Sequence, residues 1–249
     1  MDPWDVLTDK AIIGTARQVC GTASLNPLYS NPAITLREGA LYVAGQNPGG
    51  DPRVYGSQDR HEPLDHPRRP AHRKDWCKLL DEDDRDTTYR ESLRFLVSKA
   101  LPGGLEGLRD AFCTNALFMR GNVNALSAAD KRALWHVCRP WHQQWLGIVK
   151  PKVILCLGND GGASAYAWFK SMLDGVADQP ETPTYTNYRL KVCEGEFEGR
   201  PVVLIGTPNP SRWSSSSPKS ANAVANVAAI VRERLGRSQR TTSRTIAEG

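Results

Sequence analysis

Short apolar runs alternate along the chain with longer segments in which apolar residues recur every three or four positions. The apolar runs have the length and composition of buried parallel strands; they are Ala40–Ala44, Ala111–Leu117, Val153–Leu157 and Val202–Ile205. The segments with helical spacing are Thr88–Ala100, Ser127–Val149 and Ala221–Leu235. This alternation predicts an α/β fold, a three-layer α/β/α arrangement around a central four-stranded, mostly parallel sheet.

The helix at 127–149 has clear signals at both ends. Ser127 followed by Asp130 resembles a capping box, and Lys150-Pro151 ends the helix,. Its predicted buried face consists of Leu134, Cys138, Trp141, Trp145 and Ile148,. We expect the last helix to stop at Gly236,.

The whole pattern predicts one domain over residues 1–236. A segment rich in proline, histidine and charge, 51–75, reads as a long loop inserted into that domain,. The polar stretch 237–249 reads as a basic, disordered tail,.

Composition narrows the classes of protein. The chain has 249 residues, 40% of them hydrophobic and 24% charged, a globular balance. No apolar run approaches the ~20 residues of a membrane helix, and the N-terminus lacks the pattern of a signal peptide. These features predict a cytoplasmic protein that does not contact membranes. The net charge is +5, but residues 232–249 hold three of these charges, so charge is only a weak sign of an anionic partner.

Metal and cofactor signals are weak. The six cysteines are scattered without a Cys-x-x-Cys pair, which predicts reduced thiols rather than a zinc or iron–sulfur site. The three histidines of the long loop lack further ligands, and the acidic run at 81–86 reads as a solvated flank of a helix,. We predict no metal and no cofactor.

Three polar features stand out, and two of them directly follow predicted strands, where open α/β sheets bind ligands. The first is Gly45-Gln46-Asn47-Pro48-Gly49-Gly50, the second is Asn115 inside an apolar strand, and the third is Thr207-Pro208-Asn209-Pro210-Ser211-Arg212-Trp213. Taken singly, each also fits a structural role: a tight turn, an asparagine bonded to backbone, and a proline-rich connection.

Together, their order and spacing resemble the uracil-DNA glycosylase superfamily. Gly45–Gly49 is similar to the first motif, and Pro208–Ser211 is similar to the second motif of the mismatch-specific branch. The middle region resembles the iron–sulfur branch at Thr114-Asn115, Cys138-Arg139-Pro140 and 150–158, so the likeness spans about Leu41 to Leu235. The clustered cysteines of that branch are missing, and Met119 occupies the position of one of them.

The resemblance implies roles for particular residues. Asn47 would position the attacking water, and Asn209 would support the departing base or the backbone. The base would lie among Gln46, Gly49, Tyr55 and Asn115, and DNA would contact Gly50, Ser211, Arg212 and Trp213. The amide of Asn115 suits uracil in one orientation and cytosine in the other. Gly49 stands where uracil-specific branches have a tyrosine, which predicts space for substituents at C5 of the base.

The sequence therefore predicts a monomeric, monofunctional DNA glycosylase. It would flip a uracil-like or 5-modified pyrimidine from single- or double-stranded DNA and leave an abasic site. Two alternatives stay open. One is a defence enzyme that excises hydroxymethylated or glucosylated cytosine from phage DNA, and the other is a module that recognises bases without cutting.

Overall fold

The computed structural model describes most of the chain. The described residues are 2–21, 24–39, 41–48, 77, 88–101, 103–184, 187–212 and 217–245. The predicted loop insertion, 51–75, lies outside them.

Four parallel strands form the centre of the molecule, in the order β2-β1-β3-β7. They are β1 (Leu41–Gly45), β2 (Phe112–Asn115), β3 (Val153–Leu157) and β7 (Arg200–Thr207). Every residue of the first three strands is buried, as expected for strands covered on both faces. The predicted α/β class and the four parallel strands are confirmed.

The sheet is larger than the four strands that the sequence predicts. Beyond β7 it continues antiparallel through β6 (Arg189–Phe197) to β4 (Asp174–Asp178), and β5 (Thr182–Pro183) pairs with β6, giving seven strands. This half was missed because its apolar residues alternate with charged ones in β6, and β4 is mostly exposed. A half-solvated antiparallel strand has no continuous apolar run to reveal it.

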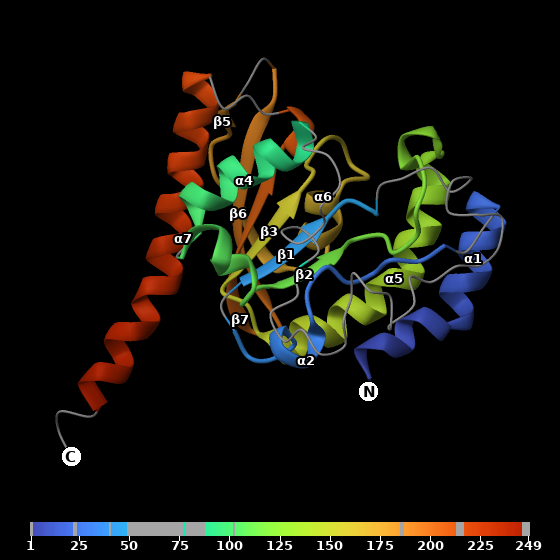
Figure 1. Ribbon diagram of the computed structural model, residues 1–249, viewed down its shortest axis with the longest axis horizontal. Coiled ribbons are helices and arrows are strands. Elements are labelled where there is room, and N and C mark those ends of the chain that lie inside the picture. The colour runs from blue at the N-terminus through green and yellow to red at the C-terminus, as the bar shows by residue number, and fades with distance from the viewer. Residues whose placement is uncertain are drawn as a thin grey trace.

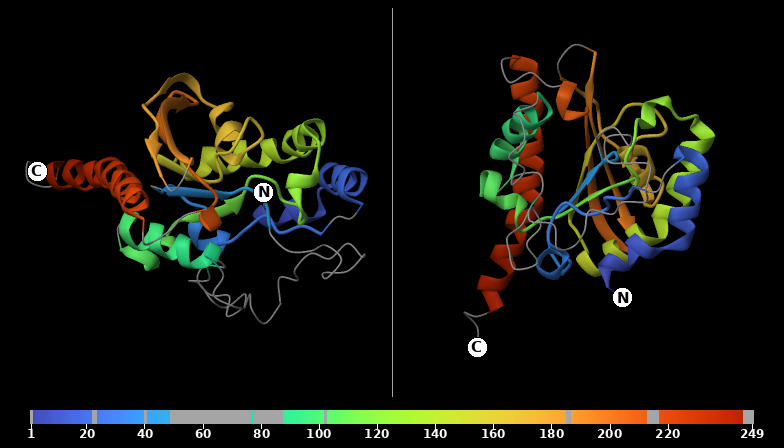
Figure 2. Two further views of the ribbon diagram at one scale, coloured as in Figure 1. Left: turned by 90° about the horizontal axis from the view of Figure 1, so that it is seen from above. Right: turned by 45° about the vertical axis from the view of Figure 1, so that its right-hand side comes forward.

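One face of the sheet is covered by α1 (Lys10–Cys20), α5 (Ala128–Val149) and α6 (Ala165–Lys170), as Figures 1 and 2 show. A short 3-10 helix, η1 (Pro3–Thr8), precedes α1. The strands contribute alternate residues to this layer, among them Tyr42, Phe112 and Ile154,. A core of packed aromatic rings results, in which Trp135 lies nearly parallel to Trp168 at 5.6 Å between centroids,.

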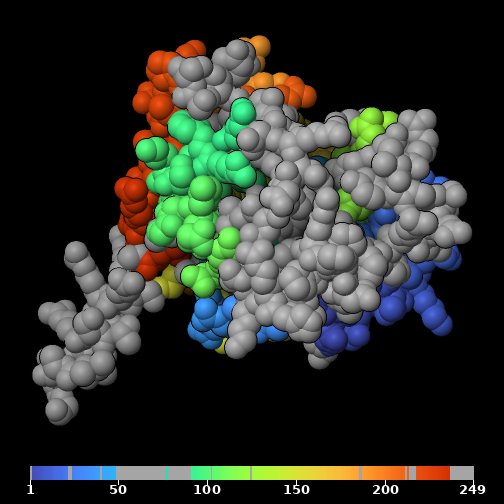
Figure 3. Space-filling model, in the orientation of Figure 1, coloured from blue at the N-terminus to red at the C-terminus, as the bar shows by residue number. Residues whose placement is uncertain are grey.

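The opposite face is covered by α4 (Thr88–Ala100) and α7 (Pro218–Thr245). The two helices lie side by side in Figure 1 and on the surface in Figure 3. The strands turn their other residues, such as Val43 and Leu155, toward this layer. The predicted end of the last helix is wrong: α7 continues through Gly236 to Thr245, where its last turns extend past the sheet. A single glycine costs a helix only about 1 kcal/mol.

The long helix α5 confirms most of its predicted pattern. The Ser127 hydroxyl accepts a hydrogen bond from the Asp130 backbone N–H at 3.1 Å, and Lys150 ends the helix in the left-handed region. The tryptophans of the helix are buried as predicted. Ile148 is the exception; it is 45% exposed rather than part of the buried face.

The N-terminal segment 24–30 runs antiparallel along β2 and its continuation. Isolated bridges join Leu25 to Met119 and Leu28 to Thr114. The segment leads into α2 (Pro32–Thr35), a single turn before β1. Because it pairs with the outer side of β2, it covers an edge that would otherwise expose unpaired backbone groups.

The connections contain three further 3-10 turns: η2 (Gly104–Leu108), η3 (Val123–Ala125) and η4 (Pro210–Arg212). All six cysteines are free thiols, and all except Cys20 are buried. Among the described helices, none is both long and apolar enough to cross a membrane.

Candidate functional site at the carboxyl edge of the sheet

The parallel strands end in one row. Gly45 of β1 is the register partner of both Asn115 in β2 and Leu157 in β3, and Leu157 is the partner of Thr207 in β7. The loops that follow β1 and β7 therefore leave the sheet at the same edge, which we call the carboxyl edge. This confirms that the two sequence motifs lie on one side of the fold.

Asn47 is fixed by its amide nitrogen. Nδ2 donates to the backbone oxygens of Pro48 and Gly121, both at 2.9 Å. Both amide hydrogens are thus used, and the side chain is half-buried. The carbonyl oxygen Oδ1 is the remaining polar atom, and it is an acceptor only. Asn47 can orient a water molecule through Oδ1, but it cannot take a proton as a strong base.

The Gln46 side chain bonds to the protein backbone and fixes the loop after β1, rather than facing a ligand. Its Oε1 accepts a hydrogen bond from the backbone N–H of Ala165 at 2.7 Å, and its Nε2 donates to the carbonyl of Ala163 at 3.0 Å. These bonds join the end of β1 to the start of α6. The amide is committed to backbone at both ends, so the geometry does not support the predicted contact of Gln46 with a base.

Asn115 is completely buried and only half satisfied. Its Nδ2 donates to the carbonyl of Asn26 at 3.0 Å, whereas its Oδ1 has no hydrogen-bond partner. Leaving a buried acceptor unpaired costs about 1–3 kcal/mol. The oxygen lies against Gly45, where a Cβ would approach it to 2.6 Å. Gly45 is thus required to make room for the amide.

The orientation of the Asn115 amide is set by segment 24–30, which pairs with β2. The Asn115 backbone N–H donates to the carbonyl of Pro27, and the Thr114 hydroxyl donates to the same oxygen at 2.7 Å. Rotating the amide by half a turn would place Oδ1 against the carbonyl of Asn26, oxygen facing oxygen. The acceptor orientation is therefore the stable one.

The second motif begins at the end of β7. The buried Thr207 hydroxyl donates to the carbonyl of Cys156 at 3.2 Å. Beyond it, Asn209 is half-buried, and its backbone oxygen accepts from the Arg212 N–H at 2.8 Å in η4. The Arg212 side chain is exposed, lies 5.1 Å from the centroid of the Tyr188 ring, and donates to the Tyr188 hydroxyl.

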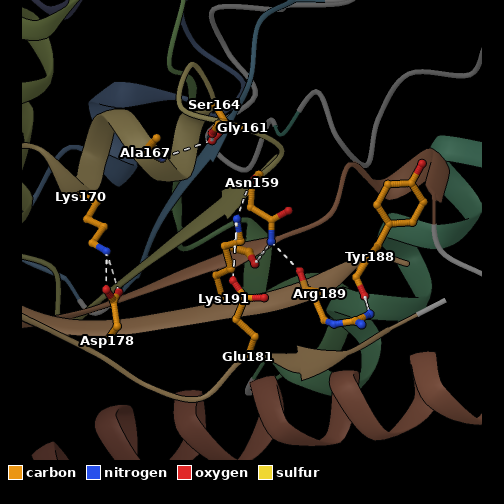
Figure 4. Close-up of polar contacts among 11 residues, drawn as sticks. Asn159, Gly161, Ser164, Ala167, Lys170, Asp178, Glu181, Tyr188, Arg189 and Lys191 are labelled. Carbon is orange, nitrogen blue, oxygen red and sulfur yellow. Dashed lines mark hydrogen bonds and ion pairs between the residues drawn. The ribbon is translucent and has the colours of Figure 1, made fainter. Parts of the chain in front are cut away.

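Asn159 is a further polar residue at this edge, and sequence reasoning missed its role. Its Nδ2 donates to the carbonyl of Arg189 at 2.7 Å and to that of Gly206 at 2.6 Å (Figure 4). It therefore ties the end of β3 to both β6 and β7. A signal was present: Asn47, Asn159 and Asn209 each lie two residues beyond the row in which the strands end.

A buried polar pair lies under the edge. The Tyr42 hydroxyl and His142 Nδ1 are 2.8 Å apart, and His142 Nε2 is 3.0 Å from the carbonyl of Ala116. A carbonyl only accepts, so Nε2 carries the hydrogen and Nδ1 accepts from Tyr42. Burial lowers the pKa of His142 to about 3. The imidazole is neutral and serves as a structural link between α5 and the residue after Asn115.

Several predicted contact residues lie outside the described part of the chain. These are Gly49, Gly50, Tyr55 and Trp213; the side chain of Ser211 is not described either. That Gly49 leaves space for substituents at C5 of the base therefore stays a prediction. The three loop histidines at 61, 66 and 72 are outside as well, and the described residues contain no cluster of His, Cys, Asp or Glu able to hold a metal ion.

A surface depression of about 560 Å³ lies elsewhere, between η1 and α1. Its lining residues are Leu7, Thr8, Lys10, Ile13, Gly14 and Arg17. They include no carboxylate, histidine or thiol, and their chemically active groups are the Thr8 hydroxyl, the Lys10 amine and the Arg17 guanidinium.

Comparison with known proteins gives no assignment. No protein-family model matches the chain, and no curated protein matches it.

Proposed function

We propose that this protein is a monofunctional DNA glycosylase, which extrudes a pyrimidine-like base and hydrolyses its bond to the sugar. One observation carries the proposal: the strand register brings the loops with Asn47 and Asn209 to the same edge, beside the buried amide of Asn115. Three asparagines in this arrangement match the roles that the sequence motifs imply. DNA would be the partner of a monomer acting in the cytoplasm.

The chemistry suits fixed neutral dipoles. Cleavage of a glycosidic bond builds positive charge on the sugar and negative charge on the departing base. Preorganised dipoles stabilise such charges without reorganising during the reaction. Asn47 would accept a hydrogen from the attacking water through Oδ1, because both hydrogens of Nδ2 are bound elsewhere. With no strong base at this position, the bond to the base would break well before the water attacks.

The orientation of Asn115 favours a second, narrower candidate: an enzyme that excises cytosine derivatives, such as hydroxymethylated or glucosylated cytosine of phage DNA. Oδ1 is the unpaired atom, and it needs a donor. Cytosine presents an amino group at C4, whereas uracil and thymine present an oxygen there and have their donor at N3. Such an oxygen requires the Nδ2 donor, and one of the two Nδ2 hydrogens is already bound to the carbonyl of Asn26.

A panel of base analogues tests both candidates. Oligonucleotides carrying uracil, thymine, ethenocytosine, 5-hydroxymethylcytosine or glucosylated hydroxymethylcytosine are incubated with the protein, treated with alkali and resolved by size. Strand breaks at any of these bases support the glycosylase. Breaks confined to cytosine derivatives support the narrower candidate, and breaks confined to uracil contradict it.

The Asn47→Ala variant separates catalysis from recognition. We expect it to lose excision and retain DNA binding, because Asn47 is assigned to the water rather than to DNA. The matched control is Asn222→Ala, on an exposed face of α7. Tight binding by the wild-type protein without breaks at any base would favour a non-catalytic recognition module. Unchanged excision by Asn47→Ala would refute the proposed mechanism.

A further inference from the structure

The antiparallel half of the sheet brings cations to the carboxyl edge. Strand β6 runs against β7, and Lys191 is the register partner of Gly206. The first residues of β6 therefore lie beside the last residues of β7, next to the second motif. Arg212 in η4 reaches the same place, because its side chain lies over the Tyr188 ring. We call this group the hairpin surface; its members are Tyr188, Arg189, Lys191 and Arg212.

The hairpin surface has an unbalanced positive charge. Among the described residues, no carboxylate lies within ion-pair distance of Arg189 or Arg212. Lys191 has one distant acidic neighbour, with 3.9 Å between its Nζ and Glu181 Oε1. The Arg212 side chain is exposed, and those of Tyr188, Arg189 and Lys191 are partly exposed. Cations left without acidic partners are suited to bind phosphate groups.

Hydrogen bonds donated by side chains hold the surface in place. Asn159 donates to the carbonyls of Arg189 and Gly206, and the Lys191 ammonium donates to the Asn159 carbonyl at 3.3 Å (Figure 4). From the other side, Asn226 of α7 donates to the Thr182 hydroxyl in β5 at 3.0 Å. A preorganised surface loses less conformational entropy when it binds.

We propose that the hairpin surface binds the DNA strand next to the extruded nucleotide. Arg189, Lys191 and Arg212 contact consecutive phosphates. The Tyr188 ring stacks on an adjacent base once Arg212 turns from the ring toward a phosphate. The inference rests on the proposed function, which places the extruded nucleotide beside the same edge. It adds the antiparallel hairpin, which none of the sequence motifs includes, to the DNA-contacting surface.

Binding is measured separately from excision, by fluorescence anisotropy with labelled single- and double-stranded oligonucleotides of natural bases over a series of salt concentrations. For the double variant Arg189→Gln/Arg212→Gln we expect affinity to fall on the order of tenfold. The slope of log K against log salt should become shallower by about two, since two phosphate contacts are lost. The control is Arg200→Gln, at the opposite end of β7, which should leave both quantities unchanged.

Two more variants should change the affinity for DNA in opposite directions. Glu181→Gln removes the carboxylate beside Lys191 and should tighten binding about twofold. Tyr188→Ala should weaken binding to single strands at least about fivefold, whereas Tyr188→Phe should retain most of it, because stacking needs the ring and not the hydroxyl.

The outcomes separate the two proposals. Wild-type affinity and salt slope in Arg189→Gln/Arg212→Gln would overturn the hairpin surface, whatever the excision assay shows. Loss of binding in this variant, combined with no excision of any base by the wild-type protein, would overturn the glycosylase and leave the hairpin surface standing.

Discussion

The parallel and antiparallel halves of the sheet meet at β7 and differ in the chemistry they bring to one edge. The parallel half brings neutral amides, Asn47, Asn115, Asn159 and Asn209. The antiparallel half brings the cations Arg189 and Lys191 at the start of β6. Amides held by backbone orient small groups and do not titrate, while exposed cations attract phosphates over several ångströms. If the proposed function holds, the parallel half aligns the reacting groups and the antiparallel half holds the nucleic acid.

The largest expected effect comes from changing the charge of one amide in the parallel half. Asn47→Asp keeps the shape of the side chain but turns an oxygen toward the carbonyls of Pro48 and Gly121, which now accept hydrogen bonds from Nδ2. We expect the single-turnover rate of excision to fall about 100-fold or more. Asn222→Asp on α7 is the control. A faster rate in Asn47→Asp would mean that a base, and not an oriented amide, is what the reaction needs.

Close packing of the parallel half predicts the next effect, on stability. A Cβ at Gly206 of β7 would lie 2.4 Å from Cδ2 of the buried Tyr166 ring. Gly206→Ala should therefore lower the free energy of unfolding by about 3 kcal/mol, measured by urea denaturation. Gly14 of α1 is exposed, and no atom lies within 4 Å of a Cβ added there, so Gly14→Ala should raise the free energy of unfolding by about 0.5–1 kcal/mol,. Equal effects at the two glycines would contradict this packing.

Acid should lower the free energy of unfolding through His142, which lies under the parallel half of the sheet. Its pKa is about 3 in the folded protein and 6.5 as the ordinary value, so the unfolded chain binds the extra proton between these pH values. The stability from the neutral imidazole is complete above pH 6.5 and declines as the pH falls below it, by about 2 kcal/mol at pH 5. His142→Gln should flatten this decline, and the exposed His136→Gln should not. An unchanged slope in His142→Gln would exclude this origin.

The smallest effect is expected in the antiparallel half. Lys170 of α6 and Asp178 of β4 form an ion pair of 2.6 Å, but their side chains are 33% and 61% exposed. Water and salt screen such a pair, so Asp178→Asn should change the free energy of unfolding by less than about 1 kcal/mol. Thermal denaturation at low and high salt measures it. A loss as large as that of Gly206→Ala would mean that surface charge stabilises this half.

The sequence predicted the parallel half well because its strands are continuous apolar runs. The same signal is missing from β6, where charged and apolar residues alternate, and the members of the hairpin surface other than Arg212 were missed with it. Asn47 and Asn209 could be located beyond strand ends from the sequence, whereas Asn115 was predicted inside a strand that in fact ends at this residue. The orientation of the Asn115 amide could not be predicted, since it depends on the carbonyl of Asn26, 89 residues earlier in the chain.

Gln46 shows another limit of sequence reasoning. Its place in the first motif favoured contact with a base, but its amide bonds to backbone at Ala163 and Ala165. Only the fold reveals that the start of α6 lies close enough to occupy both ends of the side chain.

The pairing of segment 24–30 with β2 has a practical consequence for anyone who shortens the chain. Because Asn26 holds the amide of Asn115, a fragment that starts at β1 would keep every motif and still release this amide to rotate. In such a fragment, rotation of the Asn115 amide would place its donor where its acceptor now lies. Under the proposed function, a shortened protein would then differ from the full-length protein in which base it prefers, even if it folds equally well.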